Sequence, residues 1–277
     1  MIFKDDVSIH SKTTAIFADM DISIIVEVFS NNWHILCLFF LIASLYASVG
    51  FGGGSSYLAV LAITGIAYTQ IRSTALLCNI MVVSGNVFIY AQNKEYHWRK
   101  VIPLALFSVP LAFIGGLLKI NQTVFFILLG TALLIAASIM WMSKKRHNSK
   151  KNKHELSVIK NASYGGIIGF ISGMVGIGGG IFLAPLLHLS NWDHPKKIAA
   201  TASFFILVNS IAGFFGQYSN PNFQIDWNLT LLLLITVFIG GQIGNRFSSS
   251  FFSSVQLKKA TAILIAFVGI RILISYV

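Results

Sequence analysis

The chain has 277 residues, of which 55% are hydrophobic and only 10% are charged, and its formal net charge is +11. An ordinary soluble domain has about 25% charged residues, so this composition excludes a water-soluble globular protein and predicts a membrane protein. A basic chain can bind nucleic acid, but the Lys and Arg residues here lie between apolar segments, so we expect no nucleic-acid partner.

Apolar stretches follow one another along almost the whole chain, and several approach the roughly 20 residues that a membrane-spanning helix needs. They cover residues 33–49, 55–68, 71–90, 101–118, 124–142, 164–175, 181–189, 199–216, 229–243 and 260–277. Four are shorter and form two adjacent pairs, each split by a glycine cluster. The alternating polarity typical of membrane β-barrel strands does not occur. We therefore predict an all-α polytopic membrane protein of about 8 to 10 hydrophobic helical segments, two of them broken helices.

Basic residues indicate how the chain is divided. Seven of them, Lys144, Lys145, Arg146, Lys150, Lys151, Lys153 and Lys160, crowd into one linker, and loops rich in Lys and Arg are retained in the cytoplasm. We predict an N-terminal extracytoplasmic segment (1–31), a first membrane repeat (32–142), a basic cytoplasmic linker (143–160) and a second membrane repeat (161–277).

The two halves are related in sequence. Residues 50–54 (GFGGG) match 176–180 (GIGGG) at an offset of 126 residues, and 71–75 match 198–202. In each half a glycine-split hairpin that enters and leaves on one side would precede three full crossings. Three is odd, so the halves are predicted to be inverted repeats, as in many secondary transporters. Whether the hairpins are re-entrant or cross fully as two short helices stays open from sequence.

The glycine clusters are the first candidate site. Glycine costs about 1 kcal/mol relative to alanine in a helix, so three in a row predict a break, and the helix that restarts offers unpaired N–H groups and a partial positive charge to an anion. The candidate ligands are Gly52, Gly53, Gly54, Gly178, Gly179 and Gly180. Close helix packing is the alternative, and we prefer it for the glycines with four-residue spacing, Gly165, Gly169, Gly173, Gly240 and Gly244. The spacing does not fit a dinucleotide site, so no cofactor is expected.

Polar residues within the predicted crossings form the second candidate group. Thr74 and Thr201 occupy matching positions after the two hairpins, and Asn79, Ser203 and Asn209 follow them. Ser and Thr also return hydrogen bonds to their own helix, so a structural role is the alternative for each. Arg72 is a candidate cationic contact, with snorkelling to lipid headgroups as the alternative.

Carboxylates and metal ligands are scarce in the predicted spans. Glu95, Asp193 and Asp226 lie in predicted loops, and Cys37 and Cys78 lie in apolar runs, so no metal site is indicated. A site built from hydroxyls, amides and backbone N–H groups suits an anion better than a cation.

The glycine repeat, the Pro-Leu-Leu segment at 185–187 and the Ala-Thr-Ala-Ser segment at 200–203 resemble the TauE/SafE family of sulfite exporters over residues 42–271. This resemblance implies a multi-pass permease of the bacterial cytoplasmic membrane. It would move a small sulfur-containing anion, such as sulfite or an organosulfonate, by alternating access between two inverted repeats. The first half departs from the pattern, because Ala59 stands where Pro185 would match and Ser55 and Ser56 replace aliphatic residues, which leaves the substrate open.

Other functions remain as alternatives. A passive anion channel could use the same uncharged site. An intramembrane enzyme is less well supported, because the sequence has no HExxH motif, no pair of spanning aspartates and no convincing Ser/His pair. A partner-recruiting membrane protein would not need glycine-broken hairpins. We expect no enzymatic activity, a small anion and the lipid bilayer as partners, and a homo-oligomer as one option for assembly.

Overall fold

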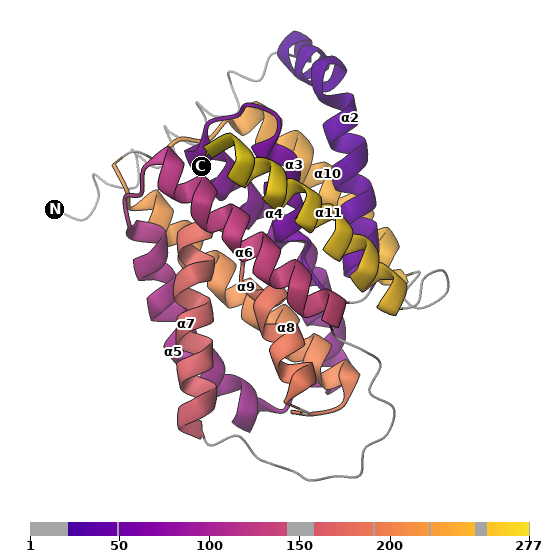
Figure 1. Ribbon diagram of the computed structural model, residues 1–277. Helices are drawn as coiled ribbons and strands as arrows, with labels where there is room; N and C mark the ends of the chain where they lie inside the picture. The colour runs from indigo at the N-terminus through magenta and orange to yellow at the C-terminus, as the bar shows by residue number, and fades with distance from the viewer. Residues whose placement is uncertain are drawn as a thin grey trace, which may run out of the picture.

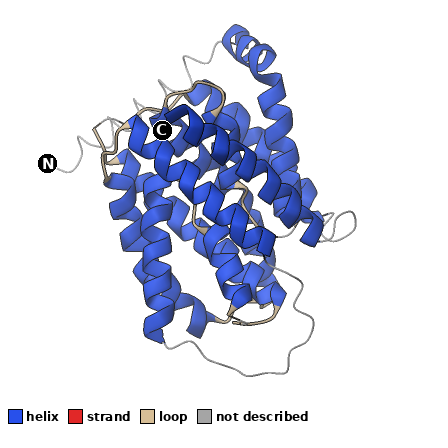
Figure 2. Ribbon diagram, in the orientation of Figure 1, coloured by secondary structure: helices blue, strands red, loops and turns tan. Residues whose placement is uncertain are grey.

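The computed structural model describes residues 22–48, 50–142, 158–190, 192–221, 223–246 and 254–276. Most of the predicted N-terminal segment and of the basic linker therefore lies outside the described residues. Within them the chain is helical and contains no strand (Figure 2). The helices are α2 (Ile22–Ala47), α3 (Gly54–Ala62), α4 (Tyr68–Gln92), α5 (Trp98–Leu117), α6 (Gln122–Met142), α7 (Val158–Val175), α8 (Gly180–Leu189), α9 (Pro195–Tyr218), α10 (Trp227–Arg246) and α11 (Ser254–Tyr276).

Six of these helices, α2, α4, α5, α6, α9 and α10, are long and apolar enough to cross a membrane. Large apolar side chains cover the outside of the bundle, and Phe88, Leu106 and Phe267 are each more than 60% exposed. Such a surface suits lipid rather than water. The prediction of an all-α multi-pass membrane protein is confirmed.

Helix α2 differs from its prediction in where it begins. The predicted apolar stretch starts at residue 33, whereas α2 starts at Ile22 and takes in the last residues assigned to the N-terminal segment. The added turns are mostly apolar, with Glu27 among them, so nothing in them stops the helix. Figure 1 shows the start of α2 extending beyond the rest of the bundle.

The two halves have the same order of helices, and the most extensive helix contacts join one half to the other. Helix α5 packs on α7 of the other half, and α10 packs on α2 in the same way. Two further contacts join equivalent helices, α4 with α9 and α6 with α11, and Figure 1 shows α6 and α11 side by side across the front of the bundle. Each half is thus completed by the other.

Glycines bring the exchanged helices into backbone contact. A Cβ atom on Gly165, Gly169 or Gly173 of α7 would overlap the carbonyl oxygens of α5, and a Cβ atom on Gly240 or Gly244 would approach those of α2 too closely. These five glycines therefore pack helices, as predicted. In each pair the residue numbers of the contacting positions increase together along the two helices. Helix α7 therefore runs parallel to α5, and α2 runs parallel to α10.

The helices break at the predicted glycine clusters. Gly50 (φ 84°) ends α2, where Phe51 N–H donates to Tyr46 O at 2.9 Å, and Gly53 (φ 83°) precedes the first residue of α3. The second half repeats this turn with Gly176 (φ 90°) and Gly179 (φ 81°). These backbone angles favour glycine, which explains the repeated pattern.

The second leg of each hairpin is short. Helices α3 and α8 contain 9 and 10 residues. At a rise of 1.5 Å per residue they are about 15 Å long, half of a hydrocarbon core of roughly 30 Å. Neither is long enough to cross a membrane alone.

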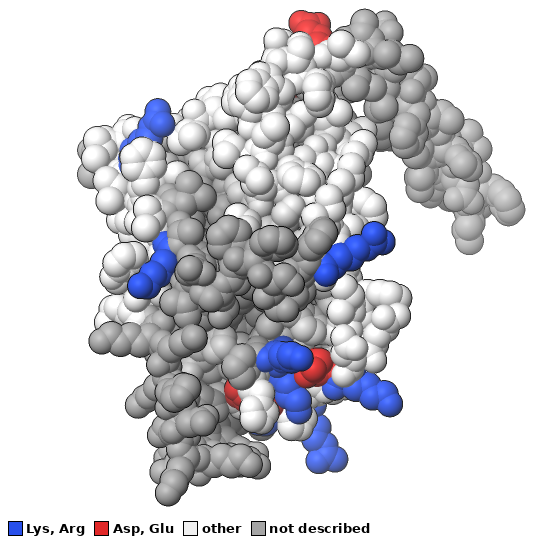
Figure 3. Space-filling model, turned by 90° about the vertical axis from the view of Figure 1, so that its right-hand side faces the viewer, with Lys and Arg blue, Asp and Glu red and all other residues white. Residues whose placement is uncertain are grey.

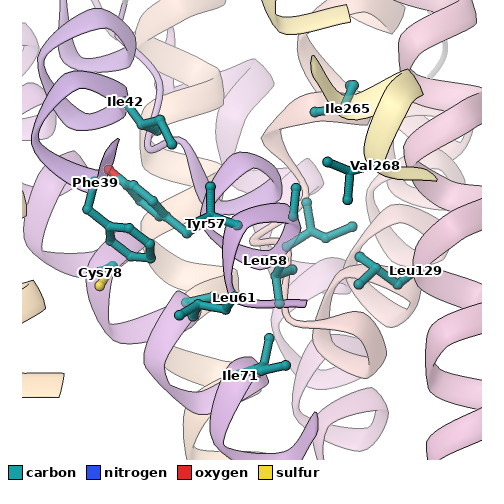
Figure 4. Packing of buried hydrophobic residues seen from close by; sticks show 14 of the residues in the cluster. Phe39, Ile42, Tyr57, Leu58, Leu61, Ile71, Cys78, Leu129, Ile265 and Val268 are labelled. Carbon is teal, nitrogen blue, oxygen red and sulfur yellow. The ribbon is translucent and has the colours of Figure 1, made fainter. Parts of the chain in front are cut away.

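Helix α3 lies in the middle of the apolar core. Its residues from Gly54 to Leu61 are all buried, and the Tyr57 ring stacks on Phe39 of α2 with ring centroids 4.6 Å apart (Figure 4). Leu58 packs in the same cluster as Leu129 of α6 and Val268 of α11. This packing holds the first glycine turn in a fixed place.

Candidate functional site

A cavity of about 430 Å³ lies between the two glycine turns. Both turns contribute to its wall, the first through residues 51–55 and the second through Ile177, Gly180 and Ile181. Its volume falls within the range that small-molecule sites commonly have.

The short helix α3 presents unpaired backbone N–H groups to this cavity. Its hydrogen bonds begin with Ser56 N–H and Tyr57 N–H, which both donate to Gly53 O, at 2.9 and 3.0 Å. Within the described chain, the N–H groups of Gly54 and Ser55 have no protein acceptor, and both residues line the cavity. A helix start of this kind carries a partial positive charge and attracts anions.

Helix α8 repeats the arrangement from the other half. Phe182 N–H and Leu183 N–H donate to Gly179 O, at 3.2 and 3.1 Å. The first two N–H groups of α8, on Gly180 and Ile181, lack an acceptor among the described residues and line the same cavity. The first two residues of each half-length helix, four in all, therefore line one space, and their N–H groups have no acceptor among the described residues.

Asn79, in the middle of α4, lies between the two turns. It is fully buried, and its Nδ2 donates to Ile177 O at 3.0 Å. Its amide packs against Gly52 and Gly54, where an added Cβ atom would overlap it. The donation to Ile177 fixes the orientation of the amide and leaves Oδ1 without a partner in the described chain. A buried acceptor left unsatisfied costs about 1–3 kcal/mol, so this position favours a donor from a ligand or water.

A stripe of amides continues from Asn79 toward the mouth of the cavity. Asn79, Asn86 and Asn93 are seven residues apart, about two helix turns. Asn79 and Asn86 therefore share one face of α4, Asn93 directly follows the end of that helix, and all three line the cavity. Asn86 Nδ2 also donates to Phe51 O at 3.4 Å. Sequence reasoning missed Asn86 and Asn93, although their spacing from Asn79 was visible.

The rim of the cavity carries charged and titratable groups. Its lining includes Lys196 and His188 together with one carboxylate, that of Glu95. These residues belong to the α4–α5 loop, the end of α8 and the start of α9. The cavity therefore opens at the end of the protein where these loops lie.

Contacts between the halves hold this end together. His97 Nδ1 lies 3.2 Å from Asp193 Oδ2, which joins the α4–α5 loop to the α8–α9 loop. Partial burial raises the pKa of Asp193, but hydrogen bonds from His194 N–H and His97, together with the charges of Lys100 and Lys197, outweigh it and leave the pKa below its usual value. Figure 3 shows a group of Lys and Arg side chains gathered at the lower end of one face.

The structure brings some of the predicted glycines together at the cavity. Gly52, Gly53, Gly54 and Gly180 line it. Gly178 and Gly179 belong to the same turn but face protein, Gly178 toward Asn79 and Ser210 and Gly179 toward Phe205.

The predicted hydroxyls lie elsewhere. Thr74 Oγ1 is 3.0 Å from Thr230 Oγ1, and Thr201 Oγ1 donates to Lys197 O at 2.8 Å. Ser203 Oγ donates to Gly50 O, and Asn209 Nδ2 donates to Phe205 O at 2.8 Å. None of these four residues is among those that line the cavity, so their role as ligands stays a prediction. Ser55 was not predicted; it stands where the second half has Ile181, and that difference between the halves was the available signal.

Comparisons with known proteins agree on the kind of protein. A family model described as "Sulfite exporter TauE/SafE" matches residues 35–272. The chain is 33% identical over 241 residues to the probable membrane transporter protein y4hK of Sinorhizobium fredii, covering 85% of this chain and 95% of that protein. It is 25% identical over 189 residues to the probable membrane transporter protein YunE of Bacillus subtilis, covering 62% and 68%. No solved structure matches the chain.

Proposed function

The chain belongs to the sulfite exporter TauE/SafE family of membrane transporters, and from this premise we propose that it moves a small sulfur-containing anion across a bacterial cytoplasmic membrane. The observation that carries the proposal is the pair of half-length helices whose free N–H groups meet in one cavity. A helix start is equivalent to roughly half a positive charge, so the two together offset about one negative charge. We propose no enzymatic activity for this site.

The substrate needs a hydrogen-bond donor as well as a negative charge. Asn79 Oδ1 is a buried acceptor that the protein leaves unpaired. A site of this kind discriminates strongly against a ligand that lacks the donor, because the acceptor then stays unsatisfied. Hydrogen sulfite or a hydroxyl-bearing organosulfonate meets both requirements, whereas a fully deprotonated, donor-free anion meets only one.

We propose that the open end of the cavity faces the cytoplasm. Lys94, Arg99, Lys100, Lys196 and Lys197 lie in or beside the loops at this end. Short loops rich in Lys and Arg stay on the cytoplasmic side of the membrane. The predicted linker, 143–160, connects α6 and α7, which end and begin at this same end, so the proposal puts the linker on the same side.

Two inverted repeats give the transporter its second state. Helix α2 runs parallel to α10 and α7 runs parallel to α5, so the two hairpins approach the glycine turns from opposite ends. In the state described here, α5 and α9 are packed closely at one end while the cavity is open at the other. Exchanging the open and closed contacts between the halves would expose the same turns to the opposite side, which is alternating access. The close packing at one end supports a transporter over a passive channel.

Binding to the purified full chain tests the proposal. Thermal unfolding is measured with sulfite near pH 7, with thiosulfate, with sulfate, and with the pair ethanesulfonate and 2-hydroxyethanesulfonate, which differ by one hydroxyl. A ligand that binds only the folded state stabilises it by about 2.7 kcal/mol at 100 times its Kd. We expect the hydroxyl-bearing ligand to bind more tightly than ethanesulfonate, and Asn79→Leu to remove the difference.

The control variant is Thr131→Val, because Thr131 lies on the exposed side of α6 and bonds only to its own helix. It should leave every shift unchanged. Equal binding of both organosulfonates to the unaltered protein would overturn the role of Asn79. No stabilisation by any sulfur anion would overturn the substrate class.

A further inference from the structure

A second, small cavity lies at the end of the protein opposite the open mouth. Its volume is about 40 Å³, and it is enclosed by the start of α4, the end of α5 and the end of α9. Arg72 lines it, whereas Asn79, on the same helix, lines the main cavity. Seven residues separate the two positions, which corresponds to roughly 10 Å along the helix axis, and the two cavities share no lining residue. The two cavities are separate places in the fold.

Arg72 is a buried cation without a charged partner. Its side chain is only 4% exposed, so it does not snorkel to the surface. Its Nη2 reaches Gly173 O at 3.5 Å, and its guanidinium lies 6.0 Å from the centre of the Phe125 ring. Its Nε has no acceptor, and no ion pair forms with Arg72 among the described residues. Burying a charge without a counter-charge is expensive in any protein and more so within a membrane.

Hydrogen-bond donors surround the same space. Gln217 is also 4% exposed; its Oε1 accepts from Ser73 Oγ at 3.1 Å, and its Nε2 has no acceptor in the described chain. Lys119 lines the cavity as well, and the described lining includes no carboxylate. In the reversed orientation of the Gln217 amide, Nε2 would donate to Ser73 instead, and the charge of Arg72 would still be uncompensated. Arg72 is therefore the group that requires an anion in either orientation.

We propose that this cavity is a second anion site, in which Arg72 binds one small inorganic anion such as chloride or hydrogen sulfite. A water needs at least about 10–15 Å³ of such space, so the cavity has room for one small anion in place of a few waters. The site itself follows from the buried charge. Its use as an outer station, meaning a binding site that the transported anion occupies near the outer end of the protein, rests on the proposed function.

The first measurement is the thermal stability of the purified full chain in an uncharged detergent, with sodium chloride or sodium gluconate at equal ionic strength. Gluconate is too large for the cavity, so we expect chloride to raise the Tm of the unaltered protein. Arg72→Gln should abolish the difference between the two salts, and Arg72→Lys should keep a smaller one. Arg271→Gln, which removes an exposed arginine from α11, is the matched control and should behave like the unaltered protein. An undiminished chloride effect in Arg72→Gln would overturn the site.

Further arms separate this site from the others. Asn79→Leu alters the main cavity and should leave the chloride effect in place. If the unaltered protein responds to chloride but binds no sulfur anion, the proposed function is contradicted and the Arg72 site stands. Adding an anionic phospholipid should not replace chloride, because Arg72 is buried; replacement would assign Arg72 to lipid headgroups and overturn the proposal. In vesicles, Arg72→Gln should raise the KM for sulfite by at least about tenfold from the outer side only. An equal change from both sides would contradict the outer station.

Discussion

The α5–α9 contact and the α4–α10 contact occupy matching places in the two halves, yet one is closed and the other is open. A Cβ atom on Gly116 of α5 would overlap Gly213 O, whereas one on the matching Gly241 of α10 would meet Val82 Cγ1 at 3.6 Å, an ordinary contact. The sequence offers a reason. At an offset of 127 residues, Gly213 and Gly216 of α9 stand where α4 has Asn86 and Ile89. The two glycines that allow the close α5–α9 approach thus have larger side chains at the matching positions of α4.

The largest expected effect comes from the first glycine turn, which lines the open cavity. Gly53→Leu places a branched side chain at φ 83°, where even a Cβ atom would lie 3.0 Å from Ile42 and 3.1 Å from Tyr57. We expect transport in vesicles to be abolished. Gly65→Leu is the matched control, because Gly65 has φ 77° but nothing within 4 Å. Comparable transport by the two variants would show that the first turn does not form the site.

A single methyl group tests the comparison directly. Gly116→Ala forces α5 away from the α9 backbone, and overpacking of this kind costs about 1–3 kcal/mol. Gly241→Ala has room for the methyl group and gains helix propensity, so its stability should stay equal or rise by up to about 1 kcal/mol. Thermal unfolding in one detergent measures both. If the two variants lose the same stability, the α5–α9 and α4–α10 contacts are equally tight, which would contradict the difference described above.

The predicted hydroxyl ligands give a smaller effect. Thr74→Val removes the hydrogen bond to Thr230, which is worth about 1 kcal/mol of folding stability. Because neither Thr74 nor Thr201 lines the cavity, we expect sulfite affinity within about twofold of normal in Thr74→Val and Thr201→Val, a difference of less than 1 kcal/mol. A tenfold loss in either variant would place that hydroxyl in contact with the anion in another state.

The smallest effect is expected at the loops that join the halves beside the open mouth. Asp193 has a lowered pKa in the folded protein, so it stabilises the fold above its unfolded pKa, and this contribution is lost as the pH falls through the lower folded value. Asp193→Asn should cost no more than about 1 kcal/mol at pH 7, because the pair with His97 is partly exposed. The difference from the unaltered protein should vanish in strongly acidic buffer. A difference that persists there would require a cause other than the charge.

The sequence predicted the parts of the fold that depend on local chemistry. Glycine clusters break helices whatever surrounds them, and seven-residue or four-residue spacings place side chains on one face. Asn79 was predicted as a polar residue within an apolar crossing, whereas the seven-residue spacing that adds Asn86 and Asn93 was missed. Thr74 and Thr201 show the limit, because matching positions do not say which face of a helix meets the cavity. The burial of Arg72 depends on how α4, α5 and α9 meet, and that arrangement of distant segments has no local signal.

The tight α5–α9 contact also determines where a membrane voltage acts. Ionic solution enters the main cavity as far as the glycine turns, so in the proposed orientation the electrical potential falls mainly across the closed outer end, the region that contains Arg72. Moving one elementary charge through 100 mV changes its energy by about 2.3 kcal/mol. A cell interior that is electrically negative favours outward movement of the monovalent anion of the proposed function, wherever along the protein the voltage falls. The glycine packing determines only the depth at which the bound anion experiences that voltage.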